Sequence, residues 1–398
     1  MQGGSGDRAR RTLGIGVVGF GWMGKAHSRS YLRIPSLYPD RLADPVLVTC
    51  ADSDATRREQ AVSAFGFAEA TDDWRVVAEH PDVDVVVVTA PNMLHVDVVS
   101  AAAAAGKAVF CEKPVGGTPE QTVEAERAAR RVVTGVGYNY RWAPLVQHAE
   151  AVIRAGGIGE ITNHRGRFLS CYGNDPLGVL SWRFLHDEAG HGVSTDLLSH
   201  AVDLAMFLVG PIVEVVGIGE TFISQRPLPR STGSHYDIGS GDDPTGDVTN
   251  EDWFGAMVRF DSGAVGTFEA SRSLTGPESQ HAFDVYGTTG AMSWNFERMN
   301  ELQIHVAGDA AASGYRTVFG GEQFPDHGAF VPGRANTIGF EDLVTIEDRH
   351  FADAVVEDRP FDPGLDAAVR YVSVQDALDA LVAQPQLGAR PRSEGTLT

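Results

Sequence analysis

An acid and a histidine share one side of a predicted helix in the second half of the chain. Asp196 and His200 are four residues apart in the largely apolar stretch Ser194–Gly210. On an α-helix this spacing places both side chains on one stripe, which Asp203 and Phe207 continue. A helix that is apolar nearly all round is buried, so charged groups on it need a purpose. A paired histidine can take a proton from an alcohol, and a purely structural Asp196–His200 hydrogen bond explains the pattern equally well.

A lysine in the first half of the chain also occupies a position suited to chemistry. Lys113 follows the apolar segment Ala108–Cys111 and precedes Pro114, which restricts its backbone. Most lysines are solvated surface residues. At the carboxyl end of a buried strand, however, the ammonium group can point toward a bound ligand.

Three glycines near the start of the chain have the spacing of a dinucleotide-binding turn. Gly19, Gly21 and Gly24 form G-x-G-x-x-G between an apolar segment, Leu13–Val18, and a predicted helix, Met23–Ile34. In such a turn the glycines allow a sharp reversal, close approach of a pyrophosphate and tight packing of the helix on the strand. A strand before the motif and a helix after it favour a nucleotide site over a simple tight turn.

An acid at the end of the second strand of such a fold binds the adenosine ribose hydroxyls. Asp52 occupies that place after the predicted strand Pro45–Ala51, further along than the usual spacing of about 20 residues. We assign the extra length to a proline-containing loop, Pro35–Pro45. The alternative is that Asp52 is the N-cap of the next helix.

Polar residues also follow the dense apolar strand Val83–Thr89. Asn92 and His95 lie just beyond it, at the edge where open parallel sheets bind ligands. Cofactor contact and a role as helix cap and first-turn residue are equally good interpretations of this pair.

The elements that must position these residues change in kind along the chain. Strands and helices alternate to about residue 136, which predicts a doubly wound parallel sheet of the Rossmann type. From about residue 145 the chain predicts an α+β unit with a large, open, mainly antiparallel sheet. Its predicted strands are Ile161–Leu169, Val213–Glu220, Trp253–Phe260, Ala264–Ser271, Phe283–Tyr286 and Ala291–Phe296, with helices at about 195–209, 343–357 and 364–383 and a long loop at Gln225–Asn250. We therefore expect a disordered leader over 1–12, a dinucleotide-binding domain over 13–140 and a substrate-binding and oligomerisation domain over 141–398, with C-terminal helices able to pack back on the first domain.

The composition of the chain excludes several classes of function. A formal net charge of −21 over 398 residues argues against nucleic acid and anionic membrane surfaces. No apolar run approaches the roughly 18 residues that a membrane helix needs. Cys50, Cys111 and Cys171 are odd in number and lack metal-ligand spacing, which favours a reduced cytoplasmic protein without a metal site.

Several short motifs occur in one characteristic order. They are G-x-G-x-x-G at 19–24, "APN" at 90–92 with His95, "EKP" at 112–114, "GYNYR" at 137–141 and D-x-x-x-H at 196–200. This combination resembles the glucose–fructose oxidoreductase, inositol dehydrogenase and MocA (Gfo/Idh/MocA) family over nearly the whole chain. Within that family, "TNEDWFGAMVRFDSGAVGTFEASR" and "FEDLVTIEDRHFADAV" are similar to the branch that oxidises inositols, levoglucosan and glycosides at a ring hydroxyl.

The resemblance implies a role for each matching position. Lys113 would polarise the substrate oxygen, and His200 would be the catalytic acid–base, oriented by Asp196. The implied cofactor-binding residues are Gly19, Phe20, Gly21, Trp22, Met23, Gly24, Asp52, Ser53, Ala90, Pro91, Asn92, His95, Glu112, Lys113 and Arg183. The implied substrate-binding residues are Lys113, Tyr140, Arg141, Trp182, His191, Asp196 and His200. Trp182–Arg183 can also be a packing tryptophan beside a surface arginine, and His191 departs from the glycines that many members have there.

The activity implied by the resemblance is reversible oxidation of a secondary ring hydroxyl on a sugar, glycoside or cyclitol. We expect NAD rather than NADP, because Asp52 would repel a 2′-phosphate and Ser53 brings no positive charge, although Arg57 or Arg58 could reach one. The alternatives are NAD-assisted cleavage or elimination of a glycoside through a transient keto-sugar, and a dinucleotide-binding regulator without catalysis. The open sheet further predicts a homodimer or homotetramer built through the C-terminal sheet.

Overall fold

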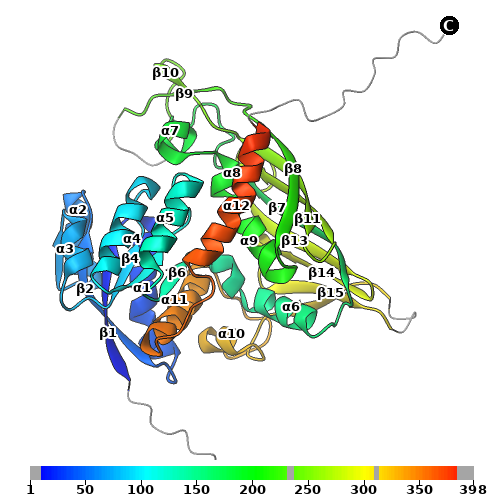
Figure 1. Cartoon of the computed structure of the whole chain (residues 1–398), viewed down its shortest axis with the longest axis horizontal. Coiled ribbons are helices and arrows are strands. Elements are labelled where there is room, and N and C mark those ends of the chain that lie inside the picture. The colour runs from blue at the N-terminus through cyan, green and yellow to red at the C-terminus, as the bar shows by residue number, and fades with distance from the viewer. Residues whose placement is uncertain (1–9, 231–236, 309–312, 383–398) are drawn as a thin grey trace, which may run out of the picture.

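The computed structural model describes residues 10–230, 237–308 and 313–382, and its first part contains a parallel sheet (Figure 1). The sheet has six strands in the order β3-β2-β1-β4-β5-β6, which is the doubly wound order that the sequence predicted. The strands are β1 (Arg11–Val18), β2 (Ala43–Ala51), β3 (Glu69–Thr71), β4 (Val85–Val88), β5 (Ala108–Cys111) and β6 (Thr134–Val136). Fully apolar strands such as β4 are buried because helices cover both faces of the sheet.

The helices of this part connect successive parallel strands. They are α1 (Trp22–Leu37), α2 (Ala55–Phe65), α3 (Trp74–Glu79), the short 3₁₀ turn η1 (Asn92–Leu94), α4 (His95–Ala104) and α5 (Pro119–Ala129). Helix α5 begins with a capping box in which the Thr118 hydroxyl accepts from the Gln121 backbone nitrogen.

Two predicted boundaries near the N-terminus are wrong. Helix α1 does not end at Ile34 but continues through Pro35 to Leu37, so most of the predicted loop is helix and strand. Pro35 lies in the last helical turn, which the buried side chains of Tyr31 and Ile34 hold against the core. Strand β1 begins at Arg11, inside the predicted leader, because Arg11 pairs with Ala43 of β2. The rest of that leader, residues 1–9, lies outside the described residues.

The second part of the chain forms the large, mainly antiparallel sheet that the sequence predicted. Eight strands lie in the order β16-β15-β14-β13-β7-β12-β11-β8. They are β7 (Ile161–Ser170), β8 (Ile212–Glu220), β11 (Trp253–Phe260), β12 (Val265–Ser271), β13 (Ser279–Gly287), β14 (Gly290–Asn295), β15 (Glu301–Val306) and β16 (Arg316–Phe319). Strands β7 and β12 run parallel, and the other neighbouring pairs are antiparallel. The sequence missed β15 and β16, and it missed the small hairpin of β9 (Gln225–Pro227) and β10 (Thr245–Asp247) in the predicted long loop.

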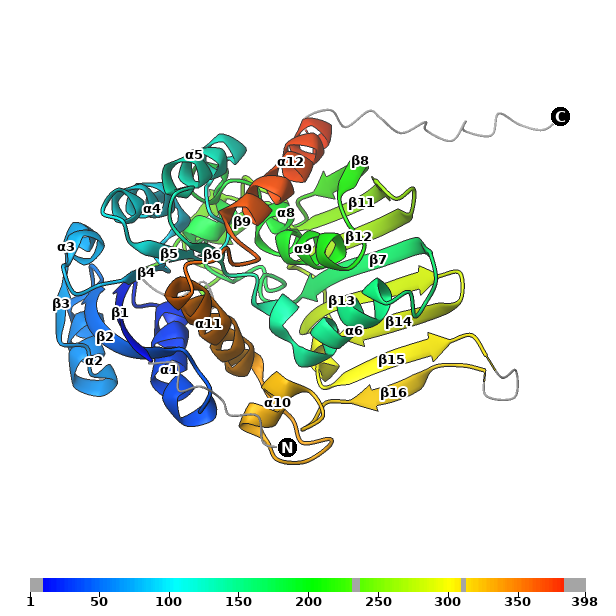
Figure 2. The same ribbon diagram turned by 60° about the horizontal axis from the view of Figure 1, so that its bottom comes forward.

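Helices cover one face of this sheet and leave the other open (Figure 2). On the covered face lie α6 (Pro144–Arg154), α8 (Val193–Asp196), α9 (Leu198–Leu208) and α12 (Leu365–Val382), over buried aromatic residues such as Trp294 and Phe254. On the open face Val216, Ile218 and Met257 are each more than half exposed.

The C-terminal helices join the two sheets. Helix α11 (Phe340–Val356) packs against α1, and α12 contacts both α5 and β8, so both lie between the two halves of the molecule (Figures 1 and 2). The remaining short elements are η2 (Asn139–Trp142), η3 (Trp182–Phe184), α7 (His186–Ala189), η4 (Phe296–Arg298) and α10 (Pro325–Phe330). Within the described ranges, no helix combines the length and apolar character that crossing a membrane requires.

Candidate active site

The glycine turn after β1 has the shape that a dinucleotide requires. Gly19 has φ +92°, and a Cβ there would lie 2.6 Å from the backbone nitrogen of Ala90. A Cβ on Gly24 would lie 2.0 Å from the carbonyl oxygen of Gly19, whereas one on Gly21 would meet nothing within 4 Å. Gly21 is also the N-cap of α1 and offers no capping side chain. The first N–H groups of α1 are therefore free of a side-chain cap, which suits them to bind a phosphate.

Asp52, at the end of β2, forms a hydrogen bond to the glycine turn. Its Oδ2 accepts from the Phe20 backbone nitrogen (2.7 Å), and its Oδ1 accepts from that of Asp54 (2.8 Å). The N-cap of α2 is Asp54, whose side chain accepts from Thr56 and Arg57, so the alternative role of Asp52 as the cap is wrong. The guanidinium of Arg57 lies 3.6 Å from Asp52.

The other predicted residues around the turn differ in exposure. The Phe20 side chain is fully buried, so its backbone is the part that faces the turn. Trp22 is 61% exposed and stacks on Phe340, with ring centroids 5.2 Å apart. Met23 and Ala90 are half-buried, and Ser53 and Pro91 are exposed.

His95 contacts the backbone of both loops that follow β4 and β5. Its Nδ1 lies 2.9 Å from the Pro114 carbonyl oxygen and its Nε2 lies 2.7 Å from that of Ala90. Asn92 is buried; its side-chain nitrogen donates to the Ala189 carbonyl (3.5 Å), and its Oδ1 has no partner among the described residues. Both ring nitrogens of His95 are therefore engaged within the protein, whereas the buried Oδ1 of Asn92 has no hydrogen-bond partner among the described residues.

Lys113 and Asp196 meet across the two halves of the chain. The Lys113 Nζ donates to the Asp196 carbonyl oxygen (2.8 Å) and to its Oδ1 (3.0 Å). The Tyr172 hydroxyl, which sequence reasoning missed, donates to Oδ2 (3.0 Å). Burial alone would raise the pKa of Asp196, but Lys113, Arg183 and Tyr172 hold it well below its usual range. Asp196 is therefore a carboxylate.

The predicted single helix with an Asp196–His200 pair is wrong. The helix breaks at Leu197 into α8 and α9, so the two residues do not share a continuous stripe. No hydrogen bond joins them in the described part of the chain, because Asp196 is engaged by Lys113 and Tyr172 instead.

His200 lies in a box of aromatic rings. Its ring centroid is 4.8 Å from that of Tyr140, 5.9 Å from Phe168 and 6.0 Å from His281. Only 7% of His200 is exposed, and its Nδ1 has no hydrogen-bond partner among the described residues. Burial, with the positive charge of Lys113 as a second cause, lowers the pKa of His200 well below its usual value. The imidazole is consequently neutral.

Glu112 faces the protein interior. Its Oε1 lies 3.1 Å from Nε2 of His27, whose Nδ1 lies 2.9 Å from Asp348 of α11. Burial opposes a charge on His27, but Asp348 and Glu112 together raise its pKa to about 10. Gly137 allows this arrangement, since a Cβ there would lie 2.6 Å from the Glu112 carboxylate. Sequence reasoning missed His27, although a polar residue on the apolar face of α1 was a visible signal.

Arg141 is held in an ion pair. Its Nε and Nη2 donate to the two carboxylate oxygens of Asp203 (2.7 and 2.5 Å), and Nη1 donates to Asp362 (3.2 Å). With 4% of the residue exposed, the guanidinium joins η2 to α9 and does not face an open pocket. Its neighbour Tyr140 contributes the ring that packs against His200.

Trp182 and Arg183 begin η3, and His191 lies just before α8. The Arg183 guanidinium lies 4.3 Å from the centre of the Trp182 ring. His191 is half-buried, with Nδ1 3.9 Å from the carboxylate of Glu251. That carboxylate accepts from the backbone nitrogens of Gly192 and Ser194 (both 2.9 Å) and so caps α8. Sequence reasoning did not single out Glu251.

Helix α12 also forms hydrogen bonds to α8. The Tyr371 hydroxyl donates to the Ser194 carbonyl oxygen (2.6 Å), and the Gln375 side-chain amide donates to the Thr195 hydroxyl. The residues immediately before Asp196 are thus fixed by an element more than a hundred residues away in sequence.

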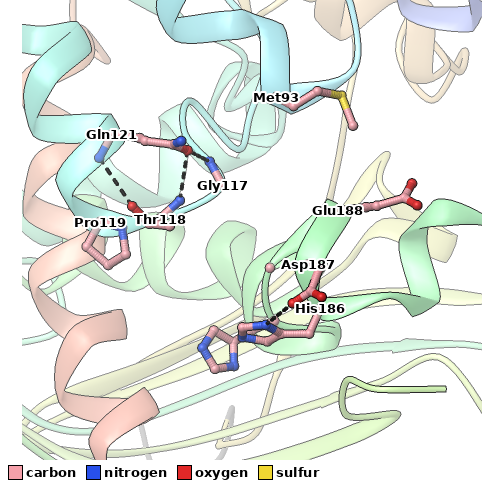
Figure 3. Close-up of a pocket in the computed structure, with 10 residues that line it drawn as sticks. Met93, Gly117, Thr118, Pro119, Gln121, His186, Asp187 and Glu188 are labelled. Carbon is pink, nitrogen blue, oxygen red and sulfur yellow. Dashed lines mark hydrogen bonds and ion pairs between the residues drawn. The ribbon is translucent and has the colours of Figure 1, made fainter. Parts of the chain in front are cut away.

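A cavity of about 230 Å³ lies next to His191, between the two halves (Figure 3). One wall comes from the loop before α5 and the other from α7 and the residues after it. The lining residues are Met93, Gly117, Thr118, Pro119, Gln121, His186, Asp187, Glu188, Gly190 and His191. His191 lines this cavity, whereas Lys113, Asp196 and His200 do not.

A dinucleotide-binding parallel sheet, with Lys113 just after its strand β5 and a neutral His200 on helix α9 of the second half, is typical of the class of NAD-dependent oxidoreductases. Comparison with known proteins agrees. Residues 13–140 match the model described as "Oxidoreductase family, NAD-binding Rossmann fold", and residues 146–293 match "GFO/IDH/MocA C-terminal domain". The chain belongs to the Gfo/Idh/MocA oxidoreductase family, and its cofactor is NAD.

Relatives in this family include named sugar and cyclitol dehydrogenases. The chain is 35% identical to levoglucosan dehydrogenase of Pseudarthrobacter phenanthrenivorans over 95% of its own length and all of that protein. It is 26% identical to inositol 2-dehydrogenase of Rhizobium meliloti, covering 74% of this chain and 78% of that one. A solved structure of levoglucosan dehydrogenase in complex with NADH and levoglucosan has a TM-score of 0.88 at 35% identity and covers 94% of this chain and 98% of that one.

Proposed function

We propose that the protein oxidises a secondary ring hydroxyl of a sugar, glycoside or cyclitol to a ketone, with NAD as the hydride acceptor. The observation that carries this proposal is the Lys113–Asp196 contact beside a buried, neutral His200. An alcohol gives up a proton and a hydride during oxidation, and this arrangement offers one group for the proton and one for the developing negative charge.

In this mechanism His200 accepts the hydroxyl proton. Its neutral state matters, because an imidazolium has no free lone pair. Lys113 stabilises the oxygen as it becomes negative, and Asp196 fixes the ammonium group through its side chain and its carbonyl oxygen. Asp196 in this scheme positions Lys113 rather than His200.

The residues around the glycine turn suit the cofactor. Gly21 leaves room for a pyrophosphate at the start of α1, and Gly19 and Gly24 allow the close packing of the turn. Asp52, which follows β2, would bind the adenosine ribose. Bound NAD would supply the hydride-accepting ring. We retain the division into a cofactor unit over 13–140 and a substrate unit over 141–398.

A second function, redox-neutral cleavage or elimination of a glycoside through a transient keto-sugar, uses the same three residues. The two differ in products. A dehydrogenase forms NADH in proportion to substrate, whereas the cleavage reaction breaks a bond without net NADH.

The test is a panel of neutral sugars, anhydrosugars, glycosides and cyclitols assayed for NADH and for cleavage products. We expect NADH formation with at least one neutral ring substrate and, in His200→Ala, a loss of about 10²–10⁴-fold in rate. Wild-type rates in folded His200→Ala protein would refute the proposed base.

We also propose a cytoplasmic homodimer or homotetramer that associates through the open face of the C-terminal sheet. The exposed apolar side chains of Val216, Ile218 and Met257 support the interface. The free thiols of Cys50, Cys111 and Cys171 support a reducing compartment.

A further inference from the structure

Two histidines are buried in the C-terminal sheet without hydrogen-bond partners. His281 of β13 and His164 of β7 are each 1% exposed, and neither ring nitrogen of either residue has a partner among the described residues. Burying an imidazole without a hydrogen bond is costly, so a pair of such residues calls for an explanation.

The surroundings of the two histidines differ. His281 stacks on Phe168 (4.8 Å, 7° between ring planes) and meets the edge of Tyr140 at 4.5 Å. Its ring centroid is 6.0 Å from that of His200. His164 instead packs against Phe260 and Phe268 in the core. Of the two, His281 is the one that adjoins the proposed base.

His200 itself lacks the partner that a general base normally has. Such a base uses one ring nitrogen toward the substrate and is held in one tautomer by a hydrogen bond at the other. Asp196 does not fill this role, since its oxygens are engaged by Lys113 and Tyr172. The Nδ1 of His200 is buried and has no hydrogen-bond partner in the described part of the chain, and the ring of His281 lies tilted beside it, 46° away from parallel.

A separation of 6.0 Å between ring centroids suits a bridge by one small hydroxylic molecule. An internal water is held by two to four polar partners, and Nδ1 of His200 with a nitrogen of His281 supplies two. We propose that His281 is a positioning residue that orients His200 through one bridging water, fixing the tautomer with hydrogen on Nδ1. This inference rests on the proposed role of His200 as the base.

The charged groups near this pair keep His281 neutral. Burial, followed by the positive charge of Lys113, lowers its pKa to about 3. For His200, burial lowers the pKa most, Lys113 and any positive charge on His281 lower it further, and Asp196 raises it, while Tyr138 and Tyr140 contribute ring edges. A neutral His281 can accept a hydrogen bond throughout the pH range of an assay, so it favours the protonated form of His200 through the bridge.

The test compares His281→Phe with His164→Phe, since phenylalanine keeps the ring stacking and removes the nitrogens. We expect His281→Phe to lower kcat about 10- to 100-fold, with KM and NAD affinity little changed. The acid limb of its pH–kcat profile should move to lower pH, because His200 loses an acceptor. His164→Phe should keep the wild-type rate and profile, and His281→Gln should recover part of the rate.

A wild-type rate and profile in His281→Phe, or equal losses in both phenylalanine variants, would overturn the inference. Should His281→Phe fail to fold, ¹⁵N NMR of the wild-type imidazoles decides the matter: hydrogen on Nδ1 of His200 supports it, and hydrogen on Nε2 overturns it. Failure of the proposed function gives a different result, namely activity that survives His200→Ala.

Discussion

At the residue scale, the contact between Lys113 and Asp196 changes the role of the acid in the site. The carboxylate lies 3.0 Å from the ammonium group and accepts from the Tyr172 hydroxyl at the same distance. Asp196 therefore controls where the positive charge of Lys113 lies, and His200 packs beside the rings of Tyr140 and Phe168 without contacting that carboxylate through a hydrogen bond in the described part of the chain.

We expect Asp196→Asn to lower kcat about 10- to 100-fold, because Lys113 loses its anionic partner and keeps only hydrogen bonds to neutral oxygens, among them the backbone carbonyl. NAD affinity should stay unchanged, since Asp52 and the glycine turn are untouched. Steady-state kinetics with NAD titration measures both quantities. Tyr172→Phe is the matched control, which keeps the carboxylate and should cost less; a wild-type kcat in Asp196→Asn would contradict the role.

Cofactor preference also belongs to single residues. We expect kcat/KM for NAD to exceed that for NADP, because the Asp52 carboxylate would repel a 2′-phosphate. Arg57 is 3.6 Å from that carboxylate, so Asp52→Asn should release a cation and improve the relative use of NADP. Arg57→Ala in the same background should reverse this gain. An NADP preference in the wild-type enzyme would show the assignment to be wrong.

Single residues were predictable where a local motif marks them. Lys113 and the three glycines stand in fixed places relative to a strand, so the sequence located them. Tyr172, Glu251 and His281 had no such signal, because each reaches the site through strand pairing or loop packing from a distant part of the chain. Local spacing also suggested the Asp196–His200 pair, and a break at one residue, Leu197, removed it.

At the scale of elements, the packing of α1 on α11 depends on a buried charge. His27 lies between Asp348 of α11 and Glu112 after β5, and its pKa is raised to about 10. Burial also raises the pKa of Asp348, and His27 offsets only part of that rise. The His27–Asp348 pair therefore holds a proton between α1 and α11, which come from opposite ends of the chain.

We expect His27→Gln to destabilise the protein by about 3–5 kcal/mol near neutral pH, since it leaves buried carboxylates unpaired. The folded-state pKa is higher than the ordinary value, so the stabilisation is complete below about pH 6.5 and is lost as the pH rises through about 10. Urea unfolding of both proteins across this range measures it. The gap between them should shrink toward pH 10, and a constant gap would contradict a charged His27.

The order of elements was predictable to a large extent, and their ends less so. Apolar runs and glycine punctuation located four of the six parallel strands, namely β1, β2, β4 and β5. The three-residue strands β3 and β6 carry too few residues to show a pattern. Pro35 suggested a helix end, yet tertiary packing of Tyr31 and Ile34 kept the helix intact.

At the scale of the whole molecule, the open sheet face sets the expected assembly. Ile218 and Met257 are 64% and 63% exposed on neighbouring strands. We expect Met257→Lys to shift the protein toward monomers in sedimentation experiments. Leu32→Lys, a change at a 52% exposed leucine on α1, is the control and should leave the assembly unchanged. A wild-type protein that is monomeric at micromolar concentration would contradict the interface.

The hydrogen bonds from α12 to Ser194 and Thr195 determine when the segment around Asp196 can reach its folded position during translation. During translation, N-terminal units fold while later residues are still being added. The parallel sheet is complete by residue 136, but the segment that carries Asp196 must await Leu365–Val382. A ribosome-bound chain stopped before Leu365 should accordingly retain NAD but not turn over substrate, and release of the finished helix should start the reaction. Nascent chains of increasing length, assayed for NAD binding and for substrate turnover, would show whether the two activities appear at different chain lengths.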